Sequence, residues 1–313
     1  MQKGRVSRVV SYPPEGRLLH TPGNQAACQS LHTLAQAQVK QTILEGRTIL
    51  CTPGHDLQVQ LGPFTGVIPR EETALGIREG TVREIAILSR VGKPTMCMVS
   101  SVLSDGTLLL SRRQAQEHTL AALLDRPLGT VLPGTITHLA PYGAFVDIGC
   151  GVTSMLPIAR CSVARISHPA QRFSIGQEIF VVLAEKDRKT NRLTLSHKEL
   201  LGTWSENAAR FAPGMTVTGL VRSRKTYGTF IELTPNLAGL ADQTEGIKEN
   251  DAVAVYCKAI QPDRMKVKLN ILQRLEEVTT PPPLFYSITS GQLSHWVYSP
   301  PDWNGPEIGT TFD

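Results

Sequence analysis

Short segments in which hydrophobic and polar residues alternate recur along the chain. Val146 and Ile148, like Ile231 and Leu233, are separated by a single acidic residue, and residues 57–61 follow the same pattern. Because successive side chains of a β-strand point to opposite faces, this period of two predicts half-buried strands. We therefore expect a mainly β protein.

Further strands and turns fit the same picture. Residues 179–183 and 252–256 are rich in valine and other apolar residues, which favours strands. Asp105-Gly106 and Thr190-Asn191 lie where tight hairpin turns are expected. Helical patterns are few and short.

Three segments outside these strands are predicted to be helical. Residues 24–41 have the pattern of one amphipathic helix, residues 114–125 end before Pro127, and residues 197–211 end before Pro213. The chain ends in a tail that contains Trp296 and Trp303 and is expected to form a hairpin around Gly291 that packs on another part of the molecule.

An internal repeat sets the architecture. Residues 134–148 realign on residues 219–233, and a fainter copy at 56–69 parallels 143–157. About five short strands in roughly 70 residues predict a small closed Greek-key barrel of OB type. We therefore expect three tandem five-stranded OB-type β-barrels with short linking helices, an N-terminal helix and a hairpin-like tail. The expected domains are an N-terminal extension (1–43, helix 24–41), a degenerate first barrel (44–113), a helical linker (114–127), a second barrel (128–196), a second helical linker (197–211), a shortened third barrel (212–272) and a tail (273–313).

Composition excludes several classes of protein. No apolar run approaches the roughly 20 residues that cross a bilayer, and residues 1–12 lack the apolar core of a secretory signal, so we expect a cytoplasmic protein with no membrane partner. The six cysteines are scattered without a Cys-x-x-Cys pair, which argues against zinc and against a disulfide framework. The net charge of +5 suits a polyanionic partner but does not identify one.

Aromatic rings are predicted on the outer face of two barrels. If Val146 and Ile148 fill the core, Asp147 faces solvent, and the period of two then puts Phe145 outside as well, with Tyr142 at the start of the strand. Outward rings on a barrel are what base stacking requires. The alternative is that a neighbouring module or the tail covers them. The third repeat has the same arrangement in Tyr227, Phe230 and Glu232.

Basic residues are expected on the same face as the rings. Leu193 and Leu195 are the inward residues of their strand, so Arg192 points outward. A run of charge alone is usually solvated surface, but cations interleaved with rings favour a phosphate backbone with splayed bases. The other candidates for this face are His138, Arg222, Arg224, Lys225, Lys266 and Lys268.

The first repeat lacks the outward rings and the outward arginine of the second. Gln58, His55 and Thr107 stand where the second repeat has Phe145, Tyr142 and Arg192. Its loop 90–93 and the pair Arg112-Arg113 could still meet phosphate, yet a structural or protein-contact role is the better hypothesis.

These residues resemble the S1 (S-one) RNA-binding repeat of the ribosomal protein S1 family. The resemblance rests on residues 142–149, 176–182, 192–196 and Trp204, and covers the second repeat fully, the third in a shortened form and the first in its second half. The degenerate first repeat, with residues 12–16, 66–72 and 296–300, is similar to short S1-like proteins of Gram-positive anaerobes. The resemblance implies RNA contacts by Tyr142, Phe145, Asp187 and Arg192, and by Tyr227, Phe230, Asp263 and Lys266.

One residue of the family pattern is missing. The position that holds a histidine in the family has Pro157 in the second repeat, Asp242 in the third and Pro69 in the first. This puts one base or sugar contact in doubt and leaves the stacking argument intact. The family implies binding of single-stranded RNA, as in mRNA during translation, with the small ribosomal subunit as a further partner.

Two other classes of function compete with this hypothesis. Such barrels also accompany ribonucleases, but the flanks show no acidic metal cluster and no nucleophile with a placed base, and Gly92-Lys93-Pro94 lacks the spacing of a phosphate loop. We therefore expect no catalysis, no cofactor, no metal and no small-molecule substrate. The other alternative is an adaptor whose barrels bind protein, or a factor in RNA decay or transcription that uses the same barrels.

Overall fold

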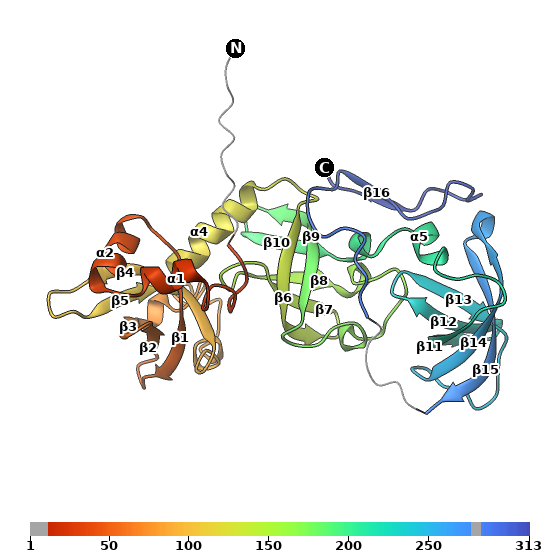
Figure 1. The fold of residues 1–313 in the computed structure, drawn as a ribbon, viewed down its shortest axis with the longest axis horizontal. Coiled ribbons are helices and arrows are strands. Elements are labelled where there is room, and N and C mark those ends of the chain that lie inside the picture. The colour runs from red at the N-terminus through yellow and green to blue at the C-terminus, as the bar shows by residue number, and fades with distance from the viewer. Residues whose placement is uncertain (1–11, 277–282) are drawn as a thin grey trace, which may run out of the picture. The chain divides into compact units, whose positions relative to one another are not determined.

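The protein is mainly β, as the sequence predicts. The computed structural model describes residues 12–276 and 283–313 and contains three closed five-stranded barrels and a two-stranded sheet (Figure 1). The chain forms two compact units. The first unit comprises residues 1–126 and 147–153, and the second comprises residues 127–146 and 154–313.

The first unit contains the first barrel. Its strands follow the order β1-β2-β3-β5-β4, and β3 and β5 are parallel where the barrel closes. Leu57, Val59 and Leu61 of β2 are fully buried in its core, as the alternating pattern predicts. The elements are α1 (Pro22–Ala27), α2 (Leu31–Val39), β1 (Leu44–Cys51), β2 (Leu57–Leu61), β3 (Phe64–Ile68), η1 (Arg70–Glu72), α3 (Ile85–Leu88), β4 (Pro94–Val102), β5 (Leu108–Ser111) and α4 (Arg112–Asp125).

The helix expected over residues 24–41 is two helices. Thr21 caps α1, which has Pro22 in its first turn and ends before Cys28. Ser30 then starts α2 by a capping box with Thr33, in which each side chain bonds the other residue's backbone amide. The amphipathic pattern continues across the break, which is why the pattern alone suggested a single helix.

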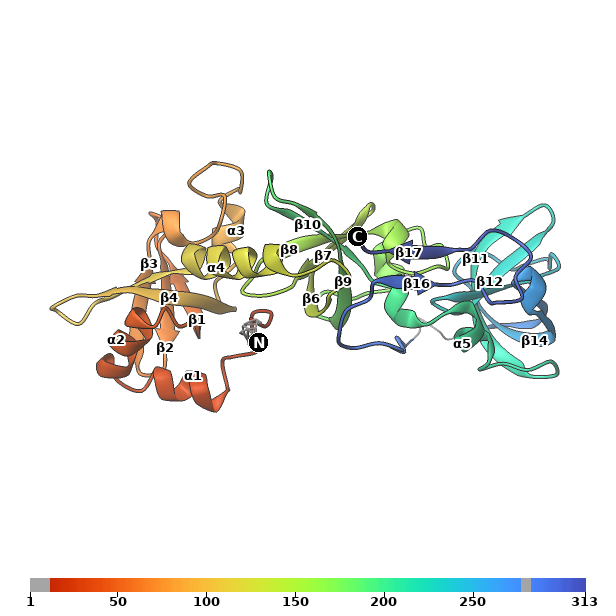
Figure 2. The same ribbon diagram turned by 90° about the horizontal axis from the view of Figure 1, so that it is seen from above.

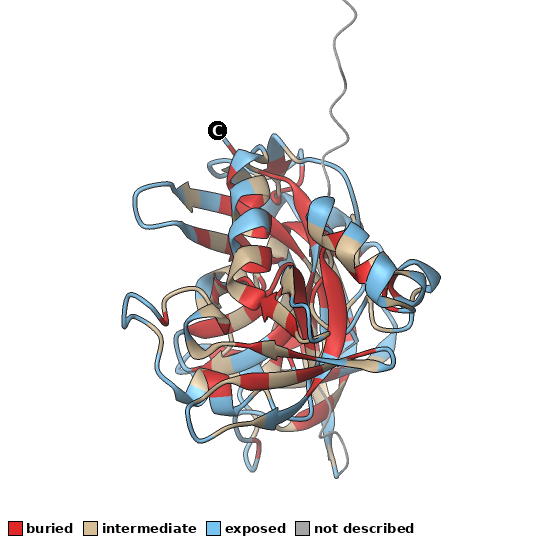
Figure 3. Ribbon diagram, turned by 90° about the vertical axis from the view of Figure 1, so that its left-hand side faces the viewer, coloured by how far each residue is buried: buried red, intermediate tan, exposed pale blue. Residues whose placement is uncertain are grey.

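The helix expected at 114–125 is present as α4, which begins two residues earlier. It lies along β4 (Figure 2) and buries one side, including Ala115, Thr119 and Leu123, while its other side is exposed (Figure 3). Ser111 caps its N-terminus, and the residue before Pro127 leaves the helical conformation.

The second unit contains the third barrel and most of the second. In the second barrel the order is β10-β8-β7-β6-β9, and in the third it is β11-β12-β13-β15-β14. Their elements are β6 (Val131–Ala140), β7 (Gly143–Asp147), β8 (Thr153–Pro157), η2 (Ile158–Arg160), η3 (Pro169–Gln171), β9 (Glu178–Asp187), β10 (Arg192–Ser196), β11 (Thr216–Lys225), β12 (Gly228–Thr234), β13 (Leu237–Ala241), β14 (Ala252–Gln261), η5 (Pro262–Arg264) and β15 (Lys266–Leu275).

The linker expected to be one helix over 197–211 is broken. It consists of a short 3-10 helix, η4 (Lys198–Leu201), and a helix α5 (Trp204–Ala208). Gly202 between them has φ +82°, a conformation that favours glycine and ends the first turn. Thr203 then caps α5 together with Glu206.

The tail forms a hairpin, but not around Gly291. The paired strands are β16 (His295–Val297) and β17 (Gly309–Thr311), whereas the Gly291 carbonyl accepts a hydrogen bond from the backbone of Val131. Trp296 packs in the core cluster of the third barrel, and Phe312 packs in a cluster of the second. The tail therefore packs on both barrels of the second unit. Residues 277–282 of the predicted tail, like the N-terminal segment 1–11, lie outside the described residues.

Candidate nucleic-acid interface

The second barrel brings three predicted residues together on its outer face. The ring of Phe145 in β7 lies 5.8 Å from that of His138 in β6 and 6.2 Å from that of Tyr142, which meets it edge-on at 87°. Tyr142 is 59% exposed, His138 is exposed and Phe145 is half-buried. These rings form what we call the second-barrel platform.

The third barrel repeats this geometry. Tyr227 and Phe230 lie 6.1 Å apart at 89°, and Tyr227 is 68% exposed. These two rings form the third-barrel platform. Two copies of one edge-on ring pair at matched positions give each barrel an aromatic surface open to solvent.

The strand register adds residues that the sequence did not reveal. In the third barrel one row runs across four strands, through Ser223, Phe230, Leu240 and Lys268. Leu240 thus lies beside the ring and Lys268 beyond it. The repeat places Met155 and Thr194 of the second barrel, which are paired in its parallel ladder, at the same two positions. Leu240 and Met155 were missed because a single strand does not show what lies next to it in the sheet.

Arg192 is exposed and faces Asp187 in the ladder between β10 and β9. Asp187 also holds the hairpin turn: it accepts hydrogen bonds from the Thr190 hydroxyl (2.6 Å) and from the backbone of Lys189 (2.9 Å). The bonds from Thr190 and Lys189, with the charge of Arg192, lower the pKa of Asp187. The aspartate therefore has a structural role in the turn beside Arg192.

In the third barrel Asp263, the predicted counterpart of Asp187, does not occupy the equivalent position. Gln261, not Asp263, faces Lys266 across the ladder and so occupies the position of Asp187. Asp263 lies in η5, with its carboxylate 3.6 Å from Arg264. The loops after β9 and β14 are equally long, so the register excludes the equivalence of Asp263 and Asp187. Lys266 and Lys268 are exposed, as are Arg224 and Lys225 near the end of β11.

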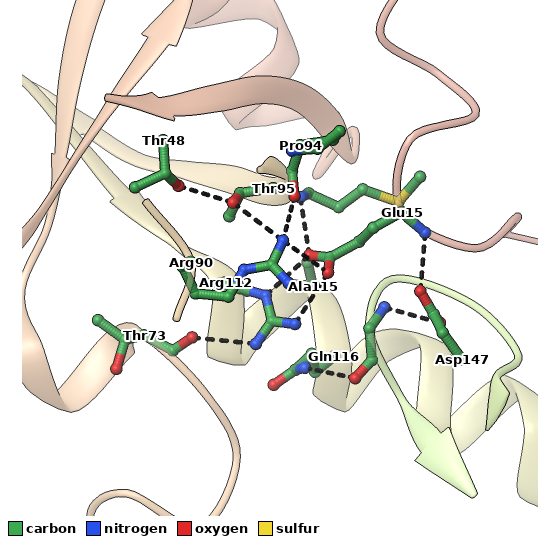
Figure 4. Close-up of polar contacts among 12 residues, drawn as sticks. Glu15, Thr48, Thr73, Arg90, Pro94, Thr95, Arg112, Ala115, Gln116 and Asp147 are labelled. Carbon is green, nitrogen blue, oxygen red and sulfur yellow. Dashed lines mark hydrogen bonds and ion pairs between the residues drawn. The ribbon is translucent and has the colours of Figure 1, made fainter. Parts of the chain in front are cut away.

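The two acidic residues expected in solvent are buried instead. Asp147 is 4% exposed and accepts a hydrogen bond from the backbone of Glu15 at 2.8 Å (Figure 4). The backbone amides of Gly149 (2.9 Å) and Gly151 (3.0 Å), which also belong to the first unit, donate to the same carboxylate. Burial, with the charge of Glu15, raises the pKa of Asp147 to about 6. Asp147 does point out of its barrel, but other backbone covers it.

Glu232 is likewise buried, within the second unit. It is 1% exposed, and its two carboxylate oxygens accept from the two terminal nitrogens of Arg172 at 2.6 and 2.9 Å. Arg222 donates through Nε at 2.6 Å, and its side chain is only 7% exposed. Burial alone would raise the pKa of Glu232, but the two guanidinium groups lower it. Arg222 is therefore part of this buried ion pair and not of the open face.

The first barrel offers no comparable surface. At the matching row it has Leu50, Gln58, Val67 and Leu109, without a ring or a cation. The equivalent of Tyr142, His55, lies 3.2 Å from Glu84.

The three arginines that were candidates for phosphate in the first repeat are engaged in ion pairs, whereas Lys93 of the same loop is exposed. Arg112 is 6% exposed and donates to the Glu15 carboxylate at 2.8 and 3.0 Å, and Arg90 lies 2.9 Å from the same carboxylate (Figure 4). Arg113 lies 3.2 Å from Glu72. These arginines stabilise the first unit instead of presenting charge to a ligand.

Within 12–276 and 283–313, no three His, Cys, Asp or Glu side chains gather as a metal ion would require. None of the helices in these ranges has the length and apolarity needed to cross a membrane.

Comparison with known proteins identifies the second barrel. The S1 RNA binding domain family matches residues 126–198. The ribosomal bS1 protein of Leuconostoc lactis is 30% identical over 191 residues, which cover 56% of this chain and 44% of the relative. The bS1 homolog of Bacillus subtilis is 28% identical over 188 residues, covering 56% and 48%. The chain thus spans less than half the length of these relatives.

Two solved structures also match. A multidomain protein with nucleic acid binding domains from Streptococcus pneumoniae is matched over 75% of each chain, with 16% identity and a TM-score of 0.26. GSP13 from Bacillus subtilis matches 33% of this chain and 67% of its own, with 22% identity and a TM-score of 0.23. At these TM-scores neither structure bears on fold or function. The resemblance predicted from the sequence is nevertheless confirmed: this protein carries an S1 RNA binding domain and is similar to ribosomal bS1 proteins over more than half of its length.

Proposed function

We propose that this protein binds single-stranded RNA through the second-barrel and third-barrel platforms. The observation that carries the proposal is the duplicated ring pair, Tyr142 with Phe145 and Tyr227 with Phe230, both edge-on and both with an exposed tyrosine. Exposed rings on a barrel face accept stacked bases, each stack contributing about 1–3 kcal/mol with little dependence on sequence.

Cations near each platform supply the second part of the binding chemistry. Arg192 in the second barrel, and Lys266 and Lys268 in the third, are exposed on the strands that close the barrel. Phosphates neutralised by such side chains release counterions, so the affinity falls as salt rises. Leu240 and Met155 extend the apolar floor next to each ring. Stacking thus provides most of the contact with bases, and charge holds the backbone.

The relatives named as ribosomal proteins support a role in translation. We infer that this protein binds mRNA during translation in the cytoplasm, with the small ribosomal subunit as a further partner. It acts by binding alone, without catalysis, cofactor or membrane.

The test is the variant Phe145→Ala with Phe230→Ala. Loss of two stacks of about 1–3 kcal/mol each predicts that the affinity for a short unstructured RNA falls by a factor between about 30 and about 20,000. Gln58→Ala is the matched control, because it changes the same position in the first barrel, and it should leave the affinity unchanged. Fluorescence anisotropy with a labelled oligonucleotide measures both. Unchanged binding by the double variant would refute the assignment of the face.

The first barrel favours a different role. Its row of Leu50, Gln58, Val67 and Leu109 is apolar at three of four positions, and Leu50 is 46% exposed. Such a row supports contact with protein, or a purely structural role, over contact with RNA. Leu50→Lys should accordingly leave RNA affinity within about twofold, while loss of affinity would place the first barrel in the RNA site.

A further inference from the structure

Arg172 is a cation with no part in the predicted binding face and no access to solvent. It follows η3, in the connection between β8 and β9 of the second barrel, and both its side chain and that of Glu232 are 0% exposed. Its guanidinium meets the Glu232 carboxylate through two parallel hydrogen bonds and also donates to the Ser162 hydroxyl at 3.0 Å. A planar fork of this kind fixes orientation as well as distance.

The partner of Arg172 belongs to the third-barrel platform strand. Glu232 and Phe230 are two residues apart in β12, so both side chains leave the same face of the strand, about 7 Å apart along it. The second barrel therefore contacts the third, through the Arg172–Glu232 ion pair, on the face that carries the platform. Tyr227 remains 68% exposed beside this contact, so the Arg172–Glu232 ion pair leaves the platform open to solvent.

A second contact holds the turn after β12. Asn236 is wholly buried, and its amide nitrogen donates to the carbonyls of Lys198 (2.7 Å) and Gly202 (2.9 Å). Its amide oxygen accepts from the backbone of Val163 at 3.1 Å. The turn is further held by the Tyr298 hydroxyl of the tail, which donates to the Asn236 carbonyl at 2.6 Å.

We propose that Arg172 and Asn236 are positioning residues that lock the second and third barrels together, so that one RNA strand engages both platforms at once. This inference rests on the proposed function. Barrels in one chain move relative to each other by default unless their interface is extensive. A locked pair presents its second platform to an already bound strand at high effective concentration and with little ordering left to do.

The test compares RNA lengths in Arg172→Met. An RNA of about 5 nucleotides can occupy one platform, whereas one of about 30 can reach both. The wild type should bind the long RNA at least tenfold more tightly than the short one. In Arg172→Met the long-RNA affinity should fall at least fivefold while the short-RNA affinity stays within twofold. Glu232 keeps Arg222 as a partner in this variant, which favours folding of the third barrel.

Arg165→Met is the matched control, since Arg165 is an exposed arginine of the same connection and its loss removes equal charge. Asn236→Ala breaks the lock from the other side and should reproduce the Arg172→Met effect, which keeps the proposal testable if one variant does not fold. Small-angle scattering should show greater separation of the barrels in both variants.

Three results would overturn the proposal: an unchanged long-RNA affinity, equal losses for both lengths, or the same loss in Arg165→Met. The failure of the proposed function is distinguishable, because then the wild type binds neither RNA, or the platform variant Phe145→Ala with Phe230→Ala binds both as well as the wild type does.

Discussion

The buried imidazole of His197 makes the stability of the second unit depend on pH. His197 is 0% exposed; its Nδ1 lies 2.7 Å from the Cys161 carbonyl oxygen and its Nε2 lies 3.0 Å from the Tyr286 hydroxyl. A carbonyl only accepts hydrogen bonds, so Nδ1 carries the proton and Nε2 accepts from the hydroxyl of Tyr286. Burial, with the charge of Arg172, lowers the pKa of His197 to about 4.

The direction of the effect follows from linkage. In the unfolded chain His197 titrates near its ordinary pKa of 6.5, so between about pH 6.5 and 4 the unfolded state binds a proton that the folded state does not. Stability is therefore complete above about pH 6.5 and falls as the pH is lowered through this window. A difference of about 2.5 pKa units at 1.36 kcal/mol each corresponds to about 3 kcal/mol lost by pH 4.

Tryptophan fluorescence reports the unfolding of the second unit, to which His197 belongs. All three tryptophans, Trp204, Trp296 and Trp303, belong to the second unit. Urea unfolding should be followed from pH 7.5 to 4 for the wild type and for His197→Asn, which keeps a donor near the Cys161 carbonyl but cannot gain a proton. The advantage of the wild type over the variant should shrink by about 3 kcal/mol. A difference that stays constant across the window would refute the reasoning; His138→Asn controls for the loss of an exposed histidine.

Three further predictions concern single side chains. Lys268→Ala should weaken RNA binding for all sequences and reduce the slope of log affinity against log salt by about one, measured by titration at several salt concentrations; an unchanged slope would separate Lys268 from the phosphates. Arg112→Met should destabilise the first unit by about 3–5 kcal/mol, because it breaks the buried pair with Glu15, and hydrogen exchange should detect this; protection equal to the wild type would contradict it. Gly239→Ala should destabilise the third barrel by about 1–3 kcal/mol, since its Cβ would lie 2.5 Å from Leu269 Cδ1, and urea unfolding with wild-type stability would show that the site relaxes.

The barrels themselves could be predicted because their evidence is local. Val146 and Ile148 are buried with Asp147 between them on the other side. In the third barrel Ile231 is buried in the same way, whereas Leu233 is half-buried where the register shifts between Glu232 and Thr234. The positions of Phe145 and Phe230 followed from that period. The evidence for the helix breaks at Ser30 and Gly202 is local too, because serine is a favoured N-cap and Gly202 adopts a positive φ. The apolar pattern runs through both breaks, which is why each segment was predicted as one helix.

What lies over an outward residue depends on distant parts of the chain and was not predictable. Glu232 was correctly placed on the outer side, yet its partner Arg172 lies 60 residues earlier, in the connection between β8 and β9, which contains no strand. Arg222 looked like a free cation for the same reason. The misplaced Asp263 has another cause: only the ladder shows that Gln261 faces Lys266.

A buried acidic residue follows the platform phenylalanine in both the second and the third barrel. Asp147 and Glu232 both stand two residues after the platform phenylalanine, on the same outward side of the strand and about 7 Å from it. A carboxylate buried at that distance can accept hydrogen bonds from another segment while the rings nearby stay exposed to solvent. Tyr142 and Tyr227 do remain 59% and 68% exposed. In the first barrel the same position is Gln60, which is half-buried and bonds only within its own hairpin, to Gly62 and Thr65. The ring and the buried acid are thus present together in two repeats and absent together in the first. In the third barrel this acid is the partner of Arg172, which is expected if the ion pair positions the third-barrel platform.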